Sequence, residues 1–278
     1  MIAHNIMMAL SIITSFLIYF LTGQYLYWYC IFFLPLYYIG AYLILMIIYM
    51  LFIAIVSWFL NKKEIPEKPN RFFYGIIRET AIFGLFFSRC KVKKVNCNLE
   101  PKKTRYMIVS NHKSNYDPII AFKCLKEDPI ICVTKPEILE MPVAGKWARY
   151  SGFIPILRDD IQQAATAINT AAKYIKEDKA SICIYPEGTR NREDGLLDFH
   201  PGSFKIAFRS KCPIVIASTK NSMNIKKNFP FKRTTVTFKI IEVLYYDDYK
   251  DKSTSDVAKY ARNLIENDLK NEALSKIR

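Results

Sequence analysis

The chain has 278 residues, a formal net charge of +15 and seven cysteines. That length allows a membrane segment followed by one soluble domain of ordinary size. A basic protein often binds nucleic acid or an anionic membrane, but this chain has no zinc-finger spacing, RNP-like motif or isolated basic tail. We therefore expect no nucleic-acid partner. Since no cysteine forms a C-x-x-C pair, we also expect a reduced, cytosol-facing protein without disulfides or a zinc site.

The first 60 residues predict a membrane segment. No Lys, Arg, Asp or Glu occurs from Ile2 to Asn61, so all 40 basic residues follow this stretch. A spanning helix needs about 20 apolar residues. Ile6 to Leu21 with its flanks can form one, and residues 28–60 suffice for a second. We predict a two-helix transmembrane hairpin turning near residues 22–24; the alternative is one span with a re-entrant or interfacial first segment.

The basic residues that follow the apolar stretch predict an orientation. Lys62 and Lys63 come directly after it, and basic residues next to spans favour the cytoplasmic side. We therefore expect an integral membrane protein whose larger, basic part lies in the cytoplasm. There it would face the anionic lipids of the membrane surface.

Residues 61–91 are predicted to form a polar linker and an amphipathic helix. From residue 71 on, helical spacing would place Arg71, Arg78 and Arg89 on one face, roughly opposite several Phe and Ile residues. A basic stripe opposite an apolar one is typical of a helix in the membrane interface. The alternative is a core helix of the soluble domain with one hydrated stripe.

Residues 92–278 alternate between strand and helix patterns. Apolar runs predict strands at 106–109, 129–133, 152–157, 181–185 and 213–217, and residues 234–244 alternate like a further strand. Apolar residues recur at helical spacing from Ile161 to Ile175, with Asp159 or Asp160 as the cap. This order predicts an α/β domain with a mostly parallel central sheet flanked by helices.

A histidine and an aspartate lie just after the first of these predicted strands. His112 follows strand 106–109, and Asp117 precedes Pro118 at a predicted helix start. A carboxylate at that place can hold one ring N–H of the histidine and leave the other nitrogen as a base. The alternative is structural, because Asp before Pro is also an ordinary helix cap.

Charged residues also follow three other predicted strands. Glu187 and Arg190 flank Gly188 and Thr189 after strand 181–185, and arginine is well suited to bind phosphate. Arg158 ends strand 152–157, and Lys135 follows strand 129–133. Parallel strands share one carboxyl-terminal edge, so these side chains could gather near His112. A simple turn and a solvated arginine are the alternatives.

Four ordered blocks and an apolar strand resemble a known family. They are Asn-His-x-x-x-x-Asp at 111–117, Lys-Pro-Glu at 135–137, Gly-x-x-x-x-x-Arg at 152–158, Pro-Glu-Gly-Thr-Arg at 186–190, and Pro-Ile-Val at 213–215. Together they resemble the 1-acyl-sn-glycerol-3-phosphate (lysophosphatidate) acyltransferase superfamily across about residues 107–217. Tyr185 stands where that family more often has Phe, and Asn191 where it commonly has Ser.

The resemblance implies transfer of a fatty acyl group from a thioester, acyl-CoA or acyl-carrier protein, to the free hydroxyl of lysophosphatidate. It implies His112 as the general base, Asp117 as the residue that orients it, and no metal or other cofactor. It assigns substrate binding to Lys135, Arg158, Glu187, Gly188, Thr189 and Arg190, with Arg158 and Lys135 on the phosphate. No Ser or Cys lies in a nucleophile elbow, so we expect direct attack on the thioester.

Other functions are compatible with the same residues. The acceptor could be lysocardiolipin, another lysophospholipid or glycerol 3-phosphate. A thioester hydrolase would release free fatty acid without an acceptor. A non-catalytic lipid-binding protein of the same fold would bind lipid and turn nothing over.

Overall fold

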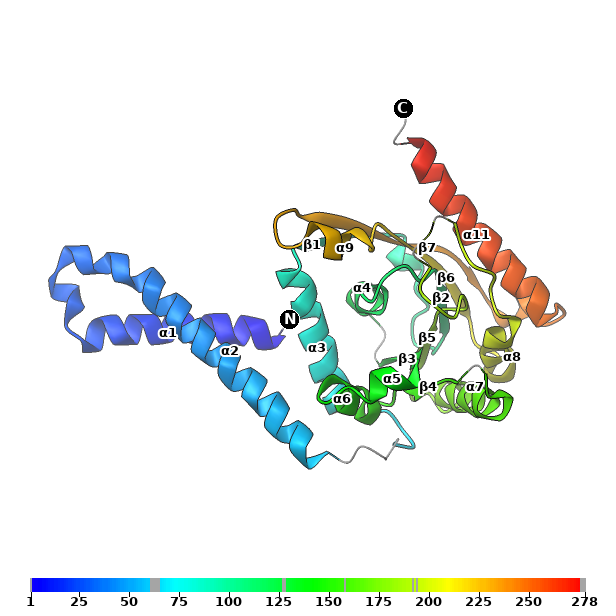
Figure 1. Cartoon of the computed structure of the whole chain (residues 1–278), viewed down its shortest axis with the longest axis horizontal. Helices are drawn as coiled ribbons and strands as arrows, with labels where there is room; N and C mark the ends of the chain where they lie inside the picture. The colour runs from blue at the N-terminus through cyan, green and yellow to red at the C-terminus, as the bar shows by residue number, and fades with distance from the viewer. Residues whose placement is uncertain are drawn as a thin grey trace. The chain divides into compact units, whose positions relative to one another are not determined.

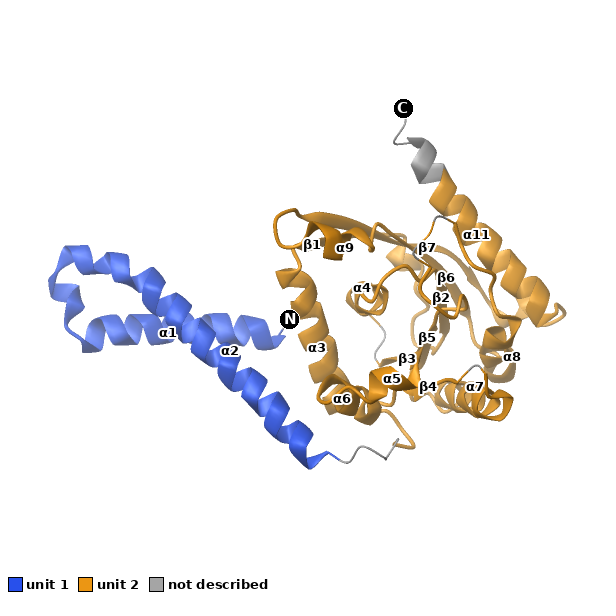
Figure 2. Cartoon of the chain, viewed as in Figure 1, with its two compact units in different colours: residues 1–62 blue, residues 63–278 orange. Residues whose placement is uncertain are grey.

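A computed structural model of the chain describes residues 2–60, 66–126, 129–157, 159–191, 193 and 195–275. The chain divides into two compact units, residues 1–62 and residues 63–278 (Figures 1 and 2). Lys62 and Lys63, on which the predicted orientation depends, lie outside the described residues.

The smaller unit is a pair of apolar helices. It contains α1 (Ile2–Leu21), the 3₁₀ turns η1 (Gln24–Leu26) and η2 (Trp28–Phe33), and α2 (Leu34–Phe59). The chain reverses at Gly23, whose φ of 69° is left-handed and suits glycine. α1 and the stretch Trp28–Phe59 are both long and apolar enough to cross a membrane. Most of their large hydrophobic side chains are exposed.

The larger unit is built on a seven-stranded sheet within its described residues. The strands are β1 (Cys90–Val95), β2 (Met107–Ser110), β3 (Ile130–Thr134), β4 (Ile154–Pro155), β5 (Ser181–Ile184), β6 (Ile214–Lys220) and β7 (Thr234–Leu244). Their order is β1-β7-β6-β2-β5-β3-β4, and only the β6–β7 pair is antiparallel. The predicted, mostly parallel α/β fold is therefore confirmed.

Helices cover both faces of this sheet (Figure 1). The longer ones are α3 (Arg71–Phe87), α4 (Asp117–Cys124), α6 (Ala144–Tyr150), α7 (Ile161–Lys176), α8 (Lys205–Ser210) and α11 (Thr254–Ser275). Short ones are η3 (Cys97–Leu99), α5 (Pro136–Leu139), η4 (Pro201–Phe204), α9 (Asn224–Asn228) and α10 (Tyr246–Tyr249). β2 and β5 are buried along their whole length, which explains why they read as continuous apolar runs. Asp160 caps α7 by accepting from the backbone N–H groups of Gln162 and Gln163.

Helix α3 differs from its prediction at the carboxyl end. It stops at Phe87, and Arg89 adopts a left-handed conformation with φ of 53°. Arg89 therefore does not continue the helical face of Arg71 and Arg78. The inner side of α3 packs against α4 and α6 and buries Leu85, while Arg78 donates to the carbonyl oxygen of Phe122 at 2.9 Å. α3 is thus a core-packed helix on one side.

The parallel arrangement puts several loops at one edge of the sheet. β2, β3, β5 and β6 all point the same way. The loops that follow them therefore leave from a common carboxyl-terminal edge, where ligands of such folds bind. His112 follows β2 and Glu187 follows β5 at this edge.

Candidate active site

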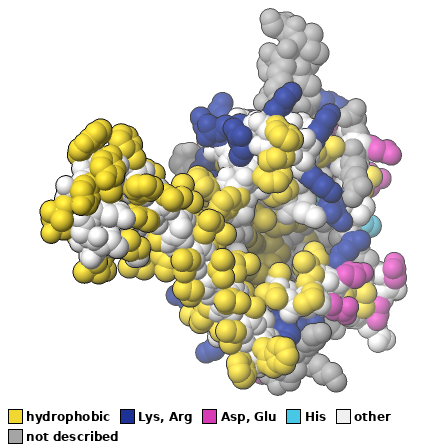
Figure 3. Space-filling view, turned by 60° about the vertical axis from the view of Figure 1, so that its left-hand side comes forward, with side chains coloured by type: hydrophobic (Ala, Val, Ile, Leu, Met, Phe, Trp, Pro, Cys, Tyr) yellow, Lys and Arg dark blue, Asp and Glu magenta, His cyan; other side chains and the backbone are white. Residues whose placement is uncertain are grey.

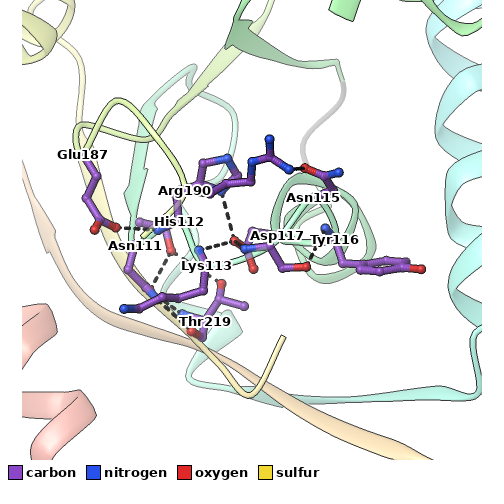
Figure 4. Close-up of polar contacts among 11 residues, drawn as sticks. Asn111, His112, Lys113, Asn115, Tyr116, Asp117, Glu187, Arg190 and Thr219 are labelled. Atoms are coloured by element: carbon purple, nitrogen blue, oxygen red, sulfur yellow. Dashed lines mark hydrogen bonds and ion pairs between the residues drawn. The ribbon is translucent and has the colours of Figure 1, made fainter. Parts of the chain in front are cut away.

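His112 and Asp117 form a close polar contact in the loop between β2 and α4. The Nδ1 atom of His112 lies 3.0 Å from Oδ2 of Asp117 (Figure 4). The same oxygen accepts from the backbone N–H groups of Lys113 and Ser114, each at 2.7 Å. Asp117 is fully buried, while the His112 side chain is 19% exposed. The loop therefore fixes the carboxylate, and the carboxylate fixes a partly exposed imidazole.

The geometry determines which ring nitrogen can act as a base. A neutral His112 that donates from Nδ1 to Asp117 keeps its lone pair on Nε2. The imidazole also stacks on the Tyr185 ring, with centroids 4.3 Å apart and planes 23° from parallel. Burial raises the pKa of the Tyr185 phenol well above its usual range, so the stacking partner stays neutral. The ring is thus held at its edge and on its face.

Asn111 connects the His112 loop to the neighbouring strand β6. Its side-chain amide donates to the Thr219 carbonyl oxygen at 2.9 Å and accepts from the Thr219 N–H at 2.8 Å. Asn111 is fully buried, so both bonds are shielded from water. Sequence reasoning included Asn111 in the motif but gave it no role; its place immediately before the histidine was the available signal.

Glu187 supports the backbone of His112. Its Oε1 accepts from the His112 N–H at 2.6 Å, and its Oε2 accepts from the Leu197 N–H at 3.0 Å. Only 3% of the Glu187 residue is exposed. Burial raises its pKa, and the two backbone hydrogen bonds oppose that rise. Both oxygens therefore already bind the protein itself.

The residues that follow Glu187 in the 186–190 block bring the guanidinium of Arg190 to the His112 loop. Gly188 has a left-handed φ of 83°, which suits glycine at this turn. Thr189 and Arg190 follow it and are exposed. Arg190 Nη1 donates to Asn115 Oδ1 at 2.5 Å, and Asn115 belongs to the His112 loop (Figure 4). The predicted meeting of Glu187 and Arg190 with the His112–Asp117 pair is therefore present in the structure.

Lys113 was not singled out from the sequence. Its Nζ donates to the carbonyl oxygens of Glu193 and Gly195, each at 2.5 Å. The backbone N–H of Asn191 also donates to the His112 carbonyl oxygen at 2.9 Å. The segment after Arg190 is therefore fastened to the His112 loop, through contacts far apart in the sequence.

Of the two remaining predicted phosphate-binding residues, only Lys135 is described, and it is not part of this network. Lys135 is exposed directly before α5, at the same edge of the sheet. Among the described residues, no hydrogen bond joins Lys135 to the His112 loop. Arg158 lies outside the described residues, so its predicted role stays a prediction.

Comparison with known proteins agrees with this architecture. Residues 91–219 match the acyltransferase family model. The chain is 30% identical over 166 residues to the 1-acyl-sn-glycerol-3-phosphate acyltransferase of Haemophilus influenzae, covering 59% of this chain and 68% of that protein. It is 27% identical over 198 residues to the enzyme of that name from Salmonella typhimurium, covering 68% and 79%.

A solved structure shows the same fold across both units. The crystal structure of the 1-acyl-sn-glycerophosphate (LPA) acyltransferase PlsC from Thermotoga maritima matches with a TM-score of 0.62 and 16% identity, over 97% of this chain and 98% of that one. The fold and the matched segment define an acyltransferase. The chain belongs to the 1-acyl-sn-glycerol-3-phosphate acyltransferase family, and the resemblance found in its motifs is confirmed.

Proposed function

We propose that this chain transfers a fatty acyl group from acyl-CoA or acyl-carrier protein to the free hydroxyl of lysophosphatidate, forming phosphatidate. His112 is the general base and Asp117 orients it. The observation that carries the proposal is the 3.0 Å contact between His112 Nδ1 and the buried Asp117 carboxylate, which leaves Nε2 to face substrate. The relatives from Haemophilus influenzae and Salmonella typhimurium are 1-acyl-sn-glycerol-3-phosphate acyltransferases, which supports the acceptor and the reaction type.

The reaction needs a base because a hydroxyl is a weak nucleophile at neutral pH. His112 Nε2 takes the hydroxyl proton while the oxygen forms a bond to the thioester carbonyl carbon. The resulting oxyanion collapses, the carbon–sulfur bond breaks, and the imidazolium returns the proton to the leaving thiolate. Asp117 stabilises the imidazolium between these steps, as the aspartate of a serine protease triad does. No acyl-enzyme, metal or further cofactor takes part in this mechanism.

Acceptor binding is assigned to the cationic side of the site. A guanidinium binds phosphate through paired, charge-assisted hydrogen bonds, and Arg190 is exposed beside the His112 loop. Gly188 and Thr189 form the turn that presents it. Arg158 and Lys135 are further proposed phosphate ligands. Glu187 contributes by holding the His112 backbone, because both of its oxygens accept from backbone N–H groups.

The proposed setting is a membrane. Residues 1–60 anchor the chain as an integral hairpin, and the catalytic unit lies on the cytoplasmic side, next to anionic lipids. Two helices long and apolar enough to span a bilayer support this anchor, and a lysophospholipid acceptor resides in the same bilayer. The full-length protein should stay in the membrane pellet after an alkaline wash; release into the supernatant would contradict a spanning anchor.

A transfer assay tests the chemistry. The protein in detergent micelles receives labelled acyl-CoA and lysophosphatidate, with His112→Ala beside the wild type. We expect labelled phosphatidate from the wild type and about a 10²- to 10⁴-fold slower rate from the variant, the usual contribution of a general base. His200→Ala is the matched control, because His200 is exposed and its side chain caps no helix. Near-normal turnover by His112→Ala would refute the base assignment.

The donor and acceptor are tested in the same format. Acyl-carrier protein replaces acyl-CoA in one series, and glycerol 3-phosphate or a different lysophospholipid replaces lysophosphatidate in another. The proposal expects lysophosphatidate to give the highest kcat/KM among the acceptors. Faster transfer to another head group would contradict the proposed acceptor while leaving the acyltransferase chemistry intact.

A further inference from the structure

Four exposed phenylalanines lie at the active-site edge of the larger unit. Phe229 and Phe231 flank Pro230 in the turn between α9 and β7, and they are 51% and 86% exposed. Phe86 and Phe87 end α3 and are 54% and 47% exposed. Large aromatic side chains gathered on a surface usually mark a site of interaction with a protein or a membrane.

The two pairs of phenylalanines belong to one surface. Arg89, just beyond α3, donates from Nη1 to the carbonyl oxygen of Pro230 at 3.2 Å. The Thr234 N–H donates to the Arg89 carbonyl oxygen at 3.2 Å, which begins the parallel β1–β7 pairing. Figure 1 shows the end of α3 meeting β1 beside α9. Contacts across 141 residues of sequence thus bring the aromatic groups together.

Basic residues surround these rings. Arg89, Lys226, Lys227, Lys232 and Arg233 are all exposed. The segments that carry them, residues 81–99 and 199–241, contain no Asp or Glu. Figure 3 shows Lys and Arg side chains gathered around hydrophobic ones on this unit. Clustered basic residues attract anionic lipid head groups, and aromatic rings favour the head-group region of a bilayer.

The same surface adjoins the active site. β6 is parallel to β2, so α9, which follows β6, lies at the edge where the His112 loop follows β2. The end of α3 also contacts that loop directly, because Ser88 Oγ donates to the Tyr116 hydroxyl at 3.4 Å. Anything that binds this surface therefore lies beside the mouth of the site.

We propose that these phenylalanines and basic residues form a docking surface for an anionic phospholipid membrane, separate from the apolar helices of the smaller unit. The rings enter the head-group region while the basic side chains bind lipid phosphates. The inference deepens the proposed function, because docking by this surface turns the His112 edge toward the bilayer that holds the acceptor. The occupant is a bilayer because basic residues, on segments that contain no Asp or Glu, complement its negative surface charge.

A fluorescent probe on the full-length chain tests the proposal without any need for turnover. Phe231→Cys is labelled with an environment-sensitive thiol dye. Background labelling of the native cysteines is measured on the wild type, whose cysteines are buried except for the half-buried Cys97. Lys102→Cys is the matched control, since Lys102 is exposed in the loop before β2, at the opposite edge of the sheet. Both proteins are reconstituted into vesicles of phosphatidylcholine with or without phosphatidylglycerol.

We expect a blue shift of the residue-231 dye in vesicles with phosphatidylglycerol, together with quenching by lipids that carry a head-group nitroxide. The shift should shrink in vesicles of phosphatidylcholine alone or at high salt, and the residue-102 dye should show neither effect. An equal blue shift of the residue-231 dye and the residue-102 dye in anionic vesicles would overturn the proposal. A shift that follows protein concentration and ignores lipid composition would also overturn it, in favour of a second copy of the chain.

A charge-reversal pair tests the basic residues. Lys226→Glu with Lys227→Glu, placed in the Phe231→Cys background, should abolish the shift. Lys102→Glu with Lys103→Glu changes the net charge by the same amount at the opposite edge and should leave it intact. An equal loss of the blue shift in both double variants would assign the effect to net charge alone and overturn the proposed docking surface. The dye shift does not require turnover. A chain without transferase activity could therefore still show membrane docking, and each proposal can be refuted without the other.

Discussion

Glu187 accepts the backbone N–H of His112 at 2.6 Å with one carboxylate oxygen, while the other oxygen holds the Leu197 N–H at 3.0 Å. A carboxylate can accept both bonds, but a carboxamide has one acceptor oxygen and must turn its NH₂ toward the other donor. The two carboxylate oxygens of Glu187 therefore hold the His112 loop in place. In the proposed mechanism, Glu187 acts on the reaction through the position of His112.

Glu187→Gln should lower kcat by about tenfold to a hundredfold, because one hydrogen bond to a charged group is lost near the base. The KM for lysophosphatidate should stay within about twofold, since this side chain contacts backbone. Steady-state kinetics with both substrates varied measures the two constants. A rise in acceptor KM at unchanged kcat would contradict the positioning role and favour direct acceptor binding.

The pH dependence of that same comparison is a second prediction. Burial raises the pKa of Glu187 above the usual value of about 4.3. As pH falls through the raised pKa, the wild-type carboxylate gains a proton and loses one acceptor, as the glutamine has already done. The ratio of wild-type to variant kcat should therefore shrink toward one on the acid side, starting above the usual Glu range. A ratio constant down to the usual Glu pKa would contradict this.

Arg190→Ala should weaken the acceptor and spare the donor. Losing a charge-assisted contact of about 1.5–3 kcal/mol predicts a rise in lysophosphatidate KM of roughly tenfold to a hundredfold, with donor KM unchanged. Arg209→Ala is the control, because exposed Arg209 on α8 also pairs with an asparagine, Asn169, through Nη1. Equal losses for both substrates would argue against phosphate binding by Arg190.

Much of this architecture is visible in the sequence. Continuous apolar runs such as Met107–Val109 mark buried parallel strands, and the polar residues that follow them mark the functional edge. Asp160 before an amphipathic repeat marks the start of α7. β1 gives a weaker signal, because this edge strand alternates exposed lysines with half-buried valines over only six residues. The local hydrophobic pattern of the sequence is enough to predict a helix or strand when one or both of its faces are buried.

The roles of individual site residues depend on contacts that leave no local pattern. Glu187 meets His112 across 75 residues, and Lys113 reaches Glu193 across 80. From sequence, a conspicuous carboxylate beside Gly188 and Arg190 favours substrate binding. The fold instead places that carboxylate against two backbone donors. Arg89 likewise fits a helical repeat in sequence, but a left-handed φ removes it from the helix.

Tyr185→Phe should be tolerated. Among the described residues the buried Tyr185 hydroxyl has only the Cys183 thiol, a weak hydrogen-bonding group, beside it, and no stronger partner. Removing an unsatisfied buried hydroxyl relieves a desolvation cost of about 1–3 kcal/mol, while the ring remains stacked on His112. We expect thermal stability in detergent equal to or above the wild type, with kcat nearly unchanged. A Tyr185→Phe protein with sharply reduced kcat would show that the hydroxyl takes part in the reaction.

Asp268 on α11 should matter for stability rather than for turnover. Its carboxylate binds Lys220 Nζ at 2.7 Å and Lys239 Nζ at 2.6 Å, and it accepts from Ser218 Oγ at 2.7 Å. Burial would raise its pKa, but these hydrogen bonds outweigh burial and lower it. Asp268→Asn should therefore cost about 2–3 kcal/mol of unfolding free energy at neutral pH, as a broken, mostly buried charge network does. Asp178→Asn is the control, because Asp178 pairs with Arg105 while its side chain is 82% exposed, and such pairs contribute little.

The lowered pKa of Asp268 also gives its stabilisation a direction in pH. The ionised form is favoured in the folded state, so the full contribution is present above the unfolded value of about 3.9. It is lost as pH falls through the lower, folded pKa. Denaturant unfolding in detergent should show a gap between wild type and Asp268→Asn that is constant near neutrality and narrows on acidification below about pH 4. If the stability difference between wild type and Asp268→Asn grew as pH fell, the pKa of Asp268 in the folded state would be raised. Lys220 and Lys239 would then not be its dominant partners.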